Sequence, residues 1–356
     1  MKGVLLHGGK GTRLKPITHT EVKQLLPGAG RAISQYCLED MIFIGIKDID
    51  IVVGRVGATD VIQYYGDGSR WGINISYTHQ DEPKGIAHAV GLVQEFVGND
   101  PFVVYLGDNL VHGGIGNLSE DFKLGKYDAY VALSRVNNSE RYGVAEMRDG
   151  KLYRLVEKLK YPASNLALTG IYFFNPSIFE VIKELKPSFR GELEITEAIQ
   201  KLIENGRNVG CQEIGGWWKD TGTAEDMIDA NRLILDGIQR HVDNLTEYEK
   251  NIIGRVYIGK GVQIDSRTKI KGPGYIGDGT RITNSYIGLN TSIGSNCDLN
   301  GMEIDDSIVM DNCIIMGDGE VKIYESLIGT GCVIRKCNGV KKGSKLIVGR
   351  DSQIAL

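Results

Sequence analysis

The sequence has 356 residues, and at about 100–200 residues per domain this length predicts two domains that each bury a core. Its 41 basic and 45 acidic residues give a net charge of −4 and form no long basic run, which argues against a nucleic-acid binder and a membrane-surface protein. No stretch reaches the ~18 apolar residues needed to cross a bilayer, and the first apolar run is too short for a signal peptide, so we expect a cytoplasmic protein. The six cysteines show neither a C-x-x-C motif nor a metal-ligand spacing with histidine, and we interpret them as free, mostly buried thiols.

Residues 1–240 alternate short β-like runs with longer helical patterns. The predicted strands are 3–8, 48–54, 102–108, 128–134 and 166–174, and the predicted helices are 32–46, 86–97, 176–185 and 194–206. This alternation predicts an α/β domain with a Rossmann-like, mostly parallel sheet covered by helices on both faces. Such sheets bind ligands at the carboxyl ends of their strands. A further helix over 225–236, ended by Gly237, is expected to lead out of the domain.

A repeat of six residues begins near residue 250. Its aliphatic positions are Ile258, Ile264, Ile270, Ile276 and Ile282, followed after a slip of one residue by Ile287, Ile293 and Leu299. This period is typical of a parallel β-helix, whereas a β-sandwich would alternate with period two. Residues 242–356 contain no His, Trp or Phe, so the histidine-dependent acyltransferase chemistry of similar repeats is not expected. We expect this domain to serve oligomerisation or regulation.

A glycine-rich stretch directly follows the first predicted strand. It reads Gly8-Gly9-Lys10-Gly11-Thr12-Arg13. Glycines allow a tight turn whose N–H groups face an anion, and Arg13 and the later Lys23 add charge suited to a triphosphate. The stretch is not a Walker A loop, and it lacks the third glycine of G-x-G-x-x-G, which argues against a nicotinamide dehydrogenase. On spacing alone, a solvated strand-to-helix turn is an equal alternative.

Nine motifs in order identify a family resemblance. They are GGKGTRLKP, KQLLP, QDEPKGIAHAV, YLGDN, ERYGVAE, LVEK, LALTGIYFF, PSFRGELEIT and WWKDTGT. The chain resembles the sugar-1-phosphate nucleotidylyltransferases, in particular the long form of the glucose-1-phosphate thymidylyltransferases. The resemblance implies a nucleotidyltransferase catalytic domain over 1–240 and a left-handed β-helix of hexapeptide repeats over 241–356. It also implies Mg²⁺-dependent transfer of a nucleotidyl group from dTTP to glucose 1-phosphate by a homo-oligomer, giving dTDP-glucose and pyrophosphate.

The implied reaction is an attack by a sugar-phosphate oxygen on the α-phosphorus of the triphosphate. A phosphate monoester with a second pKa of ~6 is mostly dianionic at neutral pH, so no general base is needed. Alignment and charge neutralisation must then carry the catalysis. The resemblance assigns catalytic roles to Arg13, Lys23 and Lys158, with Lys10 assisting.

Two aspartates match the family's Mg²⁺ ligands. These are Asp108 of YLGDN and Asp220 of WWKDTGT, and two carboxylates suffice because phosphate and water oxygens complete the shell of Mg²⁺. The alternatives are a loop cap for Asp108 and a helix N-terminal group for Asp220. We expect Trp218 to pack beneath the metal loop rather than touch a ligand.

The resemblance also assigns the two substrates. The nucleotide set is Gly8, Gly9, Gly11, Thr12, Gln24, Gln80, Gly85 and Asp108, and the sugar-phosphate set is Gly143, Glu157, Lys158, Thr169, Gly170 and Tyr172. A glutamine amide suits the imide edge that thymine and uracil share, so it does not separate dTTP from UTP. Glu157 is expected to accept hydrogen bonds from sugar hydroxyls and Lys158 to pair with the phosphate, the alternative being an exposed ion pair. Arg190 is either a support for this pocket or a surface charge.

Two other functions remain open. One is a uridylyltransferase acting on glucose- or N-acetylglucosamine-1-phosphate, and the other is a non-catalytic subunit that binds sugar nucleotides. A binder need not keep both metal ligands, so Asp108 and Asp220 together favour the enzyme. His7 stands where the family often has a small residue, and we interpret it as structural. Leu159 follows Lys158 at a position where the family usually has proline, near the expected sugar site.

Overall fold

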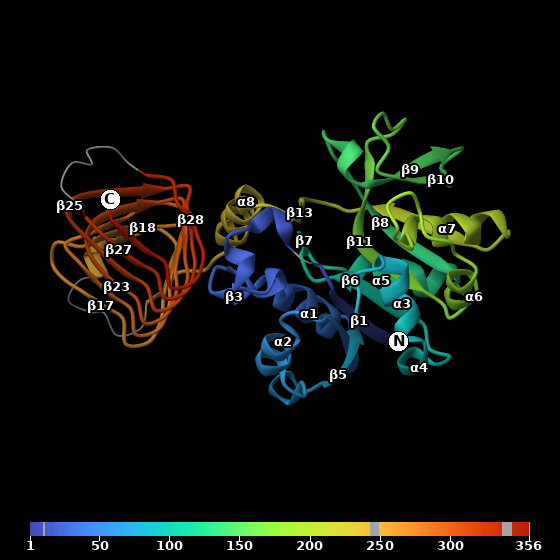
Figure 1. Ribbon diagram of the computed structural model, residues 1–356, viewed down its shortest axis with the longest axis horizontal. Coiled ribbons are helices and arrows are strands. Elements are labelled where there is room, and N and C mark those ends of the chain that lie inside the picture. The colour runs from blue at the N-terminus through green and yellow to red at the C-terminus, as the bar shows by residue number, and fades with distance from the viewer. Residues whose placement is uncertain (10, 243–248, 337–343, 356) are drawn as a thin grey trace. The chain divides into compact units, whose positions relative to one another are not determined.

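The computed structural model describes residues 1–9, 11–242, 249–336 and 344–355 (Figure 1). Contacts divide the chain into two compact units. The first, which we call the sheet unit, comprises Met1–Gly9 and Ile33–Asp220. The second, which we call the coil unit, comprises Lys10–Ala32 and Thr221–Leu356. Residues 10–32, which follow Gly8 and Gly9, therefore belong to the same compact unit as the C-terminal part of the chain.

A nine-stranded sheet forms the centre of the sheet unit. Its strands are β1 (Lys2–His7), β4 (Asp48–Gly54), β5 (Asn74–Gln80), β6 (Phe102–Leu106), β8 (Ala129–Arg135), β9 (Gly143–Arg148), β10 (Lys151–Glu157), β11 (Leu166–Phe174) and β12 (Val209–Glu213). Strands β5, β4, β1 and β6 pair parallel with one another in this order, and β4, β1 and β6 match predicted strands. Strand β11 runs antiparallel between β6 and β8, and β9 and β10 form an antiparallel hairpin, so the sheet is mixed beyond its parallel half.

Helices cover both faces of this sheet (Figure 1). They are α1 (Ile33–Phe43), α2 (Ala58–Tyr65), α3 (Ile86–Leu92), α4 (Gln94–Val97), α5 (Gly116–Gly125), α6 (Ile178–Lys183) and α7 (Ile195–Glu204). Apolar residues of α3, α6 and α7 form one core with Val4 and Leu6 of β1, while α1 packs on β1 and β6. The helix predicted over 86–97 is two helices, because Val93, with φ −91° and ψ 11°, leaves the helical region. None of the helices in the described ranges combines the length and the apolar character needed to traverse a bilayer.

The coil unit begins with the segment 11–32, which forms short turns and a hairpin. It contains three 3₁₀ turns at Thr12–Leu14, Ile17–His19 and Lys23–Leu25, and the strands β2 (Pro27–Gly28) and β3 (Arg31–Ala32). Helix α8 (Ala224–Asp236) belongs to the same unit. Thr223, which directly precedes the helix, accepts a hydrogen bond from the Asp226 N–H at 3.2 Å and so caps the helix N-terminus.

The rest of the coil unit is a left-handed β-helix. Its strands are β14 (His241–Val242), β15 (Ile252–Ile253), β16 (Val256–Ile258), β17 (Gln263–Ile264), β18 (Lys269–Lys271), β19 (Gly274–Ile276), β20 (Arg281–Thr283), β21 (Tyr286–Ile287), β22 (Thr291–Ile293), β23 (Asp298–Asp305), β24 (Ile308–Val309), β25 (Ile314–Tyr324), β26 (Leu327–Ile328), β27 (Val333–Arg335), β28 (Ile347–Val348) and β29 (Gln353–Ala355). All their pairings are parallel, and Ile258 stacks on Ile276, which stacks on Ile293. Ile258 and Ile276 are 18 residues apart and Ile276 and Ile293 are 17 apart, so one coil has three faces of about six residues, which explains the period of the sequence and its slip of one residue.

The predicted aliphatic column forms the interior of this β-helix. Every isoleucine of the six-residue repeat is buried, and Ile276, Ile282, Ile287 and Ile293 are 0% exposed. Buried apolar surface contributes about 25 cal/mol per Å², so this column stabilises the stacked coils. The cysteines of the described ranges are free thiols, as expected, and most are buried; Cys337 lies outside these ranges.

Candidate active site

A two-stranded ribbon brings the two predicted metal ligands to adjacent positions. Strand β7 (Asn109–Val111) pairs antiparallel with β13 (Trp218–Asp220), and Asp220 lies directly opposite Asn109. Asp108 immediately precedes Asn109, so both aspartates lie at the same end of the ribbon. Directly opposed residues of an antiparallel pair have Cα atoms about 4.5–5.5 Å apart. This pairing joins segments that are more than a hundred residues apart in the sequence.

Asn109 and Trp218 hold the Asp108 carboxylate in place. The Asn109 side-chain amide donates to Asp108 Oδ1 at 2.7 Å. The Trp218 indole N–H donates to Asn109 Oδ1 at 2.8 Å and to the Thr169 carbonyl at 3.0 Å. The indole therefore supports the Asp108 side chain through Asn109. Sequence reasoning gave Asn109 no role, because its contribution depends on the pairing of β7 with β13.

The donor set of this ribbon suits a hard divalent cation. No group of three or more His, Cys, Asp or Glu side chains able to hold a metal occurs among the residues that the structure describes. Two neighbouring carboxylates alone do not make a closed structural site. They fit a cation such as Mg²⁺, which takes one or two carboxylates and fills its other positions with phosphate and water oxygens. Asp108 and Asp220 would hold such an ion.

Three of the predicted nucleotide residues meet at the ends of β1 and β5. A Cβ atom added to Gly8 would lie 2.6 Å from Gln80 Oε1, so only glycine allows the Gln80 amide this position. The Gln80 amide nitrogen lies 3.3 Å from the Gly85 carbonyl and 2.9 Å from His88 Nδ1. Gln80 is 4% exposed. Its amide is thus held by the protein at the carboxyl edge of the parallel strands, where ligands of such sheets bind. Gly9 follows in the same turn.

Gly85 shows why its position requires glycine. Its φ of +103° disfavours any side chain, and an added Cβ would lie 2.4 Å from the Leu193 carbonyl oxygen. Leu193 in turn donates its N–H to the Lys84 carbonyl at 2.7 Å and accepts from the Ala87 N–H at 3.1 Å. The QDEPKG and GELEIT motifs are therefore joined by backbone hydrogen bonds.

Within the coil unit, the remaining glycine-loop residues form a compact turn. Gly11 has a φ of +59°, and its carbonyl accepts from the Thr18 hydroxyl at 2.7 Å. A Cβ on Gly11 would lie 3.3 Å from Lys23 Cβ. Thr12 begins the first 3₁₀ turn, and the next residue, Arg13, places its guanidinium against Gly222, where an added Cβ would lie 2.6 Å away. Lys10 lies outside the described residues.

Lys23 and Gln24 are the most buried polar side chains of this segment. Lys23 is 7% exposed and Gln24 is 2% exposed. A lysine this buried is uncommon unless its charge is compensated. These two residues therefore differ from Arg13, which is exposed.

Three of the predicted sugar-phosphate residues, Gly143, Glu157 and Lys158, lie on β9 and at the end of β10. Glu157 lies opposite Gly143 in the β9–β10 ladder, and a Cβ on Gly143 would lie 2.9 Å from Glu157 Oε2. Glu157 accepts from the Thr196 hydroxyl at 3.0 Å and from Arg190 at 3.3 Å. Lys158 Nζ lies 3.6 Å from Glu157 Oε1. Arg190 thus supports Glu157 rather than standing as an isolated surface charge, and Thr196 is a contact that sequence reasoning missed.

Thr169, Gly170 and Tyr172 lie on β11, where the Thr169 carbonyl accepts from the Trp218 indole of β13. The Thr169 hydroxyl donates to the Ala132 carbonyl at 3.1 Å and is fully buried, so it serves the sheet. Gly170 has a φ of +80°, and an added Cβ would lie 2.8 Å from Leu106 Cδ1. Burial, with Glu157 and Asp108 nearby, raises the pKa of Tyr172 well above its usual value, so this phenol stays protonated.

His7 is an unexpected polar group at the end of β1. It is 4% exposed, and neither ring nitrogen has a hydrogen-bond partner among the described residues. Burial lowers its pKa to about 3, against a smaller opposing effect of Asp108. Its ring contacts Tyr65 edge-on and would lie 3.1 Å from a Cβ on Gly107. His7 is therefore a neutral imidazole beside the residue that precedes Asp108.

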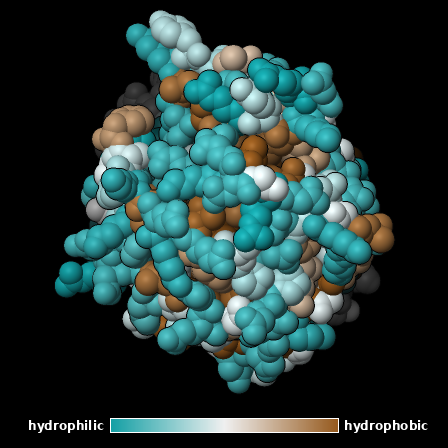
Figure 2. All heavy atoms as spheres, turned by 90° about the vertical axis from the view of Figure 1, so that its right-hand side faces the viewer, coloured by the Kyte–Doolittle hydropathy of each residue, from teal (hydrophilic) through white to brown (hydrophobic). Residues whose placement is uncertain are grey.

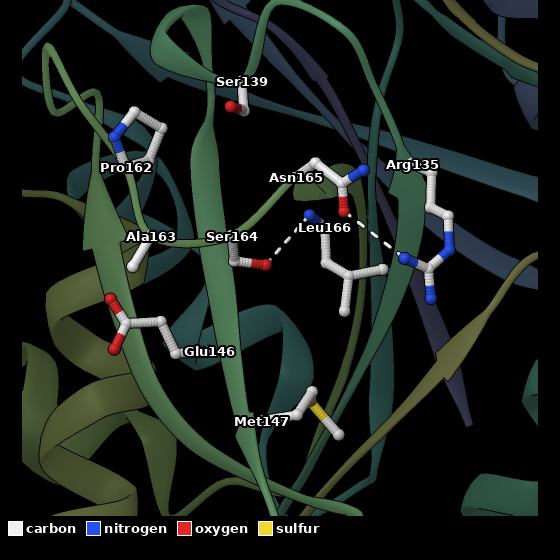
Figure 3. Close-up of a pocket in the computed structure, with 9 residues that line it drawn as sticks. All are labelled: Arg135, Ser139, Glu146, Met147, Pro162, Ala163, Ser164, Asn165 and Leu166. Atoms are coloured by element: carbon white, nitrogen blue, oxygen red, sulfur yellow. Dashed lines mark hydrogen bonds between the residues drawn. The ribbon is translucent and has the colours of Figure 1, made fainter.

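A separate cavity of about 630 Å³ lies along β9 and the chain that enters β11 (Figure 3). Its lining residues are Arg135, Ser139, Glu146, Met147, Pro162, Ala163, Ser164, Asn165 and Leu166. None of them belongs to the predicted site. Arg135 donates to Asn165 at 3.4 Å, and Ser164 accepts from the Leu166 N–H at 3.1 Å, as the dashed lines in Figure 3 mark. On the face shown in Figure 2, hydrophobic residues form small groups separated by hydrophilic ones.

Comparison with known proteins gives consistent matches over the whole chain. Residues 2–237 match the family model of nucleotidyl transferases. A glucose-1-phosphate thymidylyltransferase of Streptomyces griseus is 42% identical over 354 residues, which cover 99% of each chain. The low-salt glycan biosynthesis nucleotidyltransferase Agl11 of Haloferax volcanii is 41% identical over 359 residues, covering 100% of each chain. A Bacillus anthracis crystal structure, described there as a glucose-1-phosphate thymidylyltransferase with sucrose, has a TM-score of 0.63 and 41% identity and covers 65% of this chain and 94% of that chain.

Proposed function

The chain belongs to the nucleotidyl transferase family, and from this we propose that it is a Mg²⁺-dependent enzyme that transfers a thymidylyl group from dTTP to glucose 1-phosphate. The products are dTDP-glucose and pyrophosphate. The observation that carries the proposal is the ribbon that sets Asp108 beside Asp220. A relative named as a glucose-1-phosphate thymidylyltransferase, which matches over 99% of this chain, supports the choice of donor and acceptor.

In the proposed reaction a phosphate oxygen of glucose 1-phosphate attacks the α-phosphorus of dTTP. The bond from this phosphorus to the oxygen that bridges to the β-phosphate breaks, and pyrophosphate leaves with that electron pair. No proton has to be removed from the dianionic nucleophile. Mg²⁺, when bound, supplies positive charge to the phosphate oxygens. Asp108 and Asp220 hold the ion, while Arg13 and Lys23 neutralise the triphosphate and the leaving pyrophosphate.

The acceptor is proposed to bind between β9, β10 and β11. Glu157, held by Thr196 and Arg190, keeps its carboxylate oriented to accept hydrogen bonds from sugar hydroxyls. Lys158, whose φ is +42°, is proposed to pair with the sugar phosphate. Gly143 and Gly170 leave room that side chains would fill. Tyr172, protonated at neutral pH, adds no negative charge near the anionic acceptor.

For the base we propose Gln80, Gly85 and Gln24 as the residues that contact it. The Gln80 amide is held by its neighbours and can face the imide edge of a pyrimidine. We further propose that residues 1–240 act as the catalytic domain in the cytoplasm, and that residues 241–356 assemble the homo-oligomer. Light scattering on the full chain tests the assembly.

A pyrophosphate-release assay tests the proposal. Each nucleoside triphosphate is combined with glucose 1-phosphate and with N-acetylglucosamine 1-phosphate, with and without a chelator. We expect the highest kcat/KM for dTTP with glucose 1-phosphate and no turnover in the chelator. A preference for UTP would make the protein a uridylyltransferase, and sugar-nucleotide binding without turnover for any pair would make it a non-catalytic subunit.

A further inference from the structure

The last described coil of the β-helix contacts the segment that carries Arg13 and Lys23. Both parts belong to the coil unit. Arg350 donates to the two oxygens of the Glu21 carboxylate, Nε to Oε1 and a terminal nitrogen to Oε2, both at 3.0 Å. This is the two-pronged geometry in which a guanidinium binds a carboxylate most specifically. The Glu21 side chain is 14% exposed and that of Arg350 is 45% exposed.

The residue before Arg350, Gly349, brings the backbone of the β-helix close to the backbone of the segment. A Cβ added to Gly349 would lie 3.2 Å from the Pro16 carbonyl oxygen and 3.9 Å from Ile17 Cα. Ile17 is fully buried. The segment is thus contacted at residues 16–17 and at residue 21 by two consecutive residues of the β-helix.

A second contact joins the hairpin of β2 and β3, which follows the segment, to helix α8. Asn231 is fully buried, and its side-chain oxygen accepts from the Ala29 N–H at 2.9 Å and from the Ser292 hydroxyl at 2.6 Å. Its amide nitrogen donates to the Asn290 carbonyl at 3.0 Å. One side chain therefore joins the hairpin after the segment to a coil of the β-helix.

Between these attachments the segment is short and bonded to itself. Thr18 bonds to Gly11, and Gly11 packs against Lys23. Glu21 stands two residues before Lys23 along the chain. A shift of the Glu21 backbone is therefore expected to move Lys23, because the chain between them spans at most about 7 Å.

We propose that Arg350 is a positioning residue for the triphosphate, acting through Glu21 on the segment 11–26. This rests on the proposed function of Arg13 and Lys23. It adds to the assembly or regulatory role expected for the repeat domain, because the β-helix then contributes to substrate binding in its own subunit. Loss of the Arg350 guanidinium should therefore weaken binding of the nucleotide and leave binding of the acceptor sugar unchanged.

Steady-state kinetics of the full chain tests this role. Arg350→Ala is expected to raise the KM for dTTP roughly 3- to 10-fold while the KM for glucose 1-phosphate stays within about 2-fold. Arg350→Lys keeps the charge and loses the two-pronged geometry, so its KM for dTTP is expected to lie between those of the unmodified chain and Arg350→Ala. Combining Glu21→Arg with Arg350→Glu is expected to restore part of the lost affinity. Arg267→Ala is the matched control, since Arg267 pairs with Asp265 at 3.4 Å in the same β-helix.

Amide hydrogen exchange of residues 11–26 without nucleotide gives a readout independent of catalysis. We expect faster exchange there in Arg350→Ala than in Arg267→Ala, with equal melting temperatures. Unchanged exchange and an unchanged KM for dTTP would overturn the proposal, as would equal rises in both KM values. If the unmodified chain released no pyrophosphate, the proposed function would fail, and the exchange result would still decide whether Arg350 holds the segment.

Discussion

Replacing Trp218 with phenylalanine tests how the protein positions Asp108. The change keeps an aromatic ring and removes the indole N–H that bonds to Asn109 and Thr169 at 2.8 and 3.0 Å. Asn109 then loses the contact that orients its amide toward Asp108. We expect both the stability of the sheet unit and the turnover rate to fall.

The size of the effect follows from the burial of the two acceptors. Asn109 is 3% exposed and Thr169 is fully buried, so water cannot easily replace the indole at either oxygen. A lost hydrogen bond costs about 0.5–1.5 kcal/mol, and a buried acceptor left unsatisfied costs about 1–3 kcal/mol. We therefore expect the free energy of unfolding to fall by about 2–4 kcal/mol. Loss of a group that orients a metal ligand typically costs about 10–100-fold in activity.

Urea unfolding followed by circular dichroism and pyrophosphate release at saturating substrate measure the two effects. Trp217→Phe is the matched control, because Trp217 is the adjacent residue and contacts His112 through its ring. We expect that control to retain most of its kcat and to lose less stability. Similar losses in both variants would refute the idea that the indole N–H supports Asp108.

Two further changes test buried features of the site. The pKa of His7 is about 3 in the folded protein against 6.5 for the free group, so the unfolded chain binds more protons between these values and stability falls as the pH drops through this window. His7→Leu should remove roughly 3 kcal/mol of the stability difference between pH 7 and pH 4, and an unchanged pH slope in urea unfolding would contradict this. Gly170→Ala places a Cβ 2.8 Å from Leu106 at a φ of +80°, and should cost more than Gly150→Ala, where φ is +74° and the space is open. Equal melting temperatures for the two glycine variants would show that the crowding at Gly170 is relieved.

The sequence predicts those elements whose signal is local. The strands over 48–54 and 166–174 match β4 and β11, and the helix expected over 225–236 matches α8 within one residue. These segments carry continuous apolar runs or clear end signals. Strand β5 was not predicted because most of its residues are half-buried or exposed, so its apolar pattern is weak. The hairpin of β9 and β10 turns at Asp149-Gly150, both with positive φ, and such a dipeptide signals a turn without any apolar periodicity.

The site shows the same division between local and long-range information. Motifs single out Asp108 and Asp220, yet their proximity depends on the pairing of β7 with β13, which no local pattern reveals. Asn109 and Thr196 act only through partners distant in the sequence, so spacing could not identify them. The contact between Glu21 and Arg350 spans 329 positions and follows from the stacking of the coils. Motifs therefore identify Asp108 and Asp220, whereas residues such as Asn109 and Thr196, which support the site, become apparent only from the tertiary structure.

The most direct test of the proposed metal site is dTDP-glucose synthesis by Asp108→Asn and Asp220→Asn. Asn keeps the size of the side chain and removes the charge that a hard cation requires. We expect each variant to lose at least about 100-fold in kcat while its melting temperature stays near that of Asp60→Asn, an exposed aspartate of α2. Turnover that survives in both variants, or in a chelator, would contradict the assignment of these two aspartates to the metal.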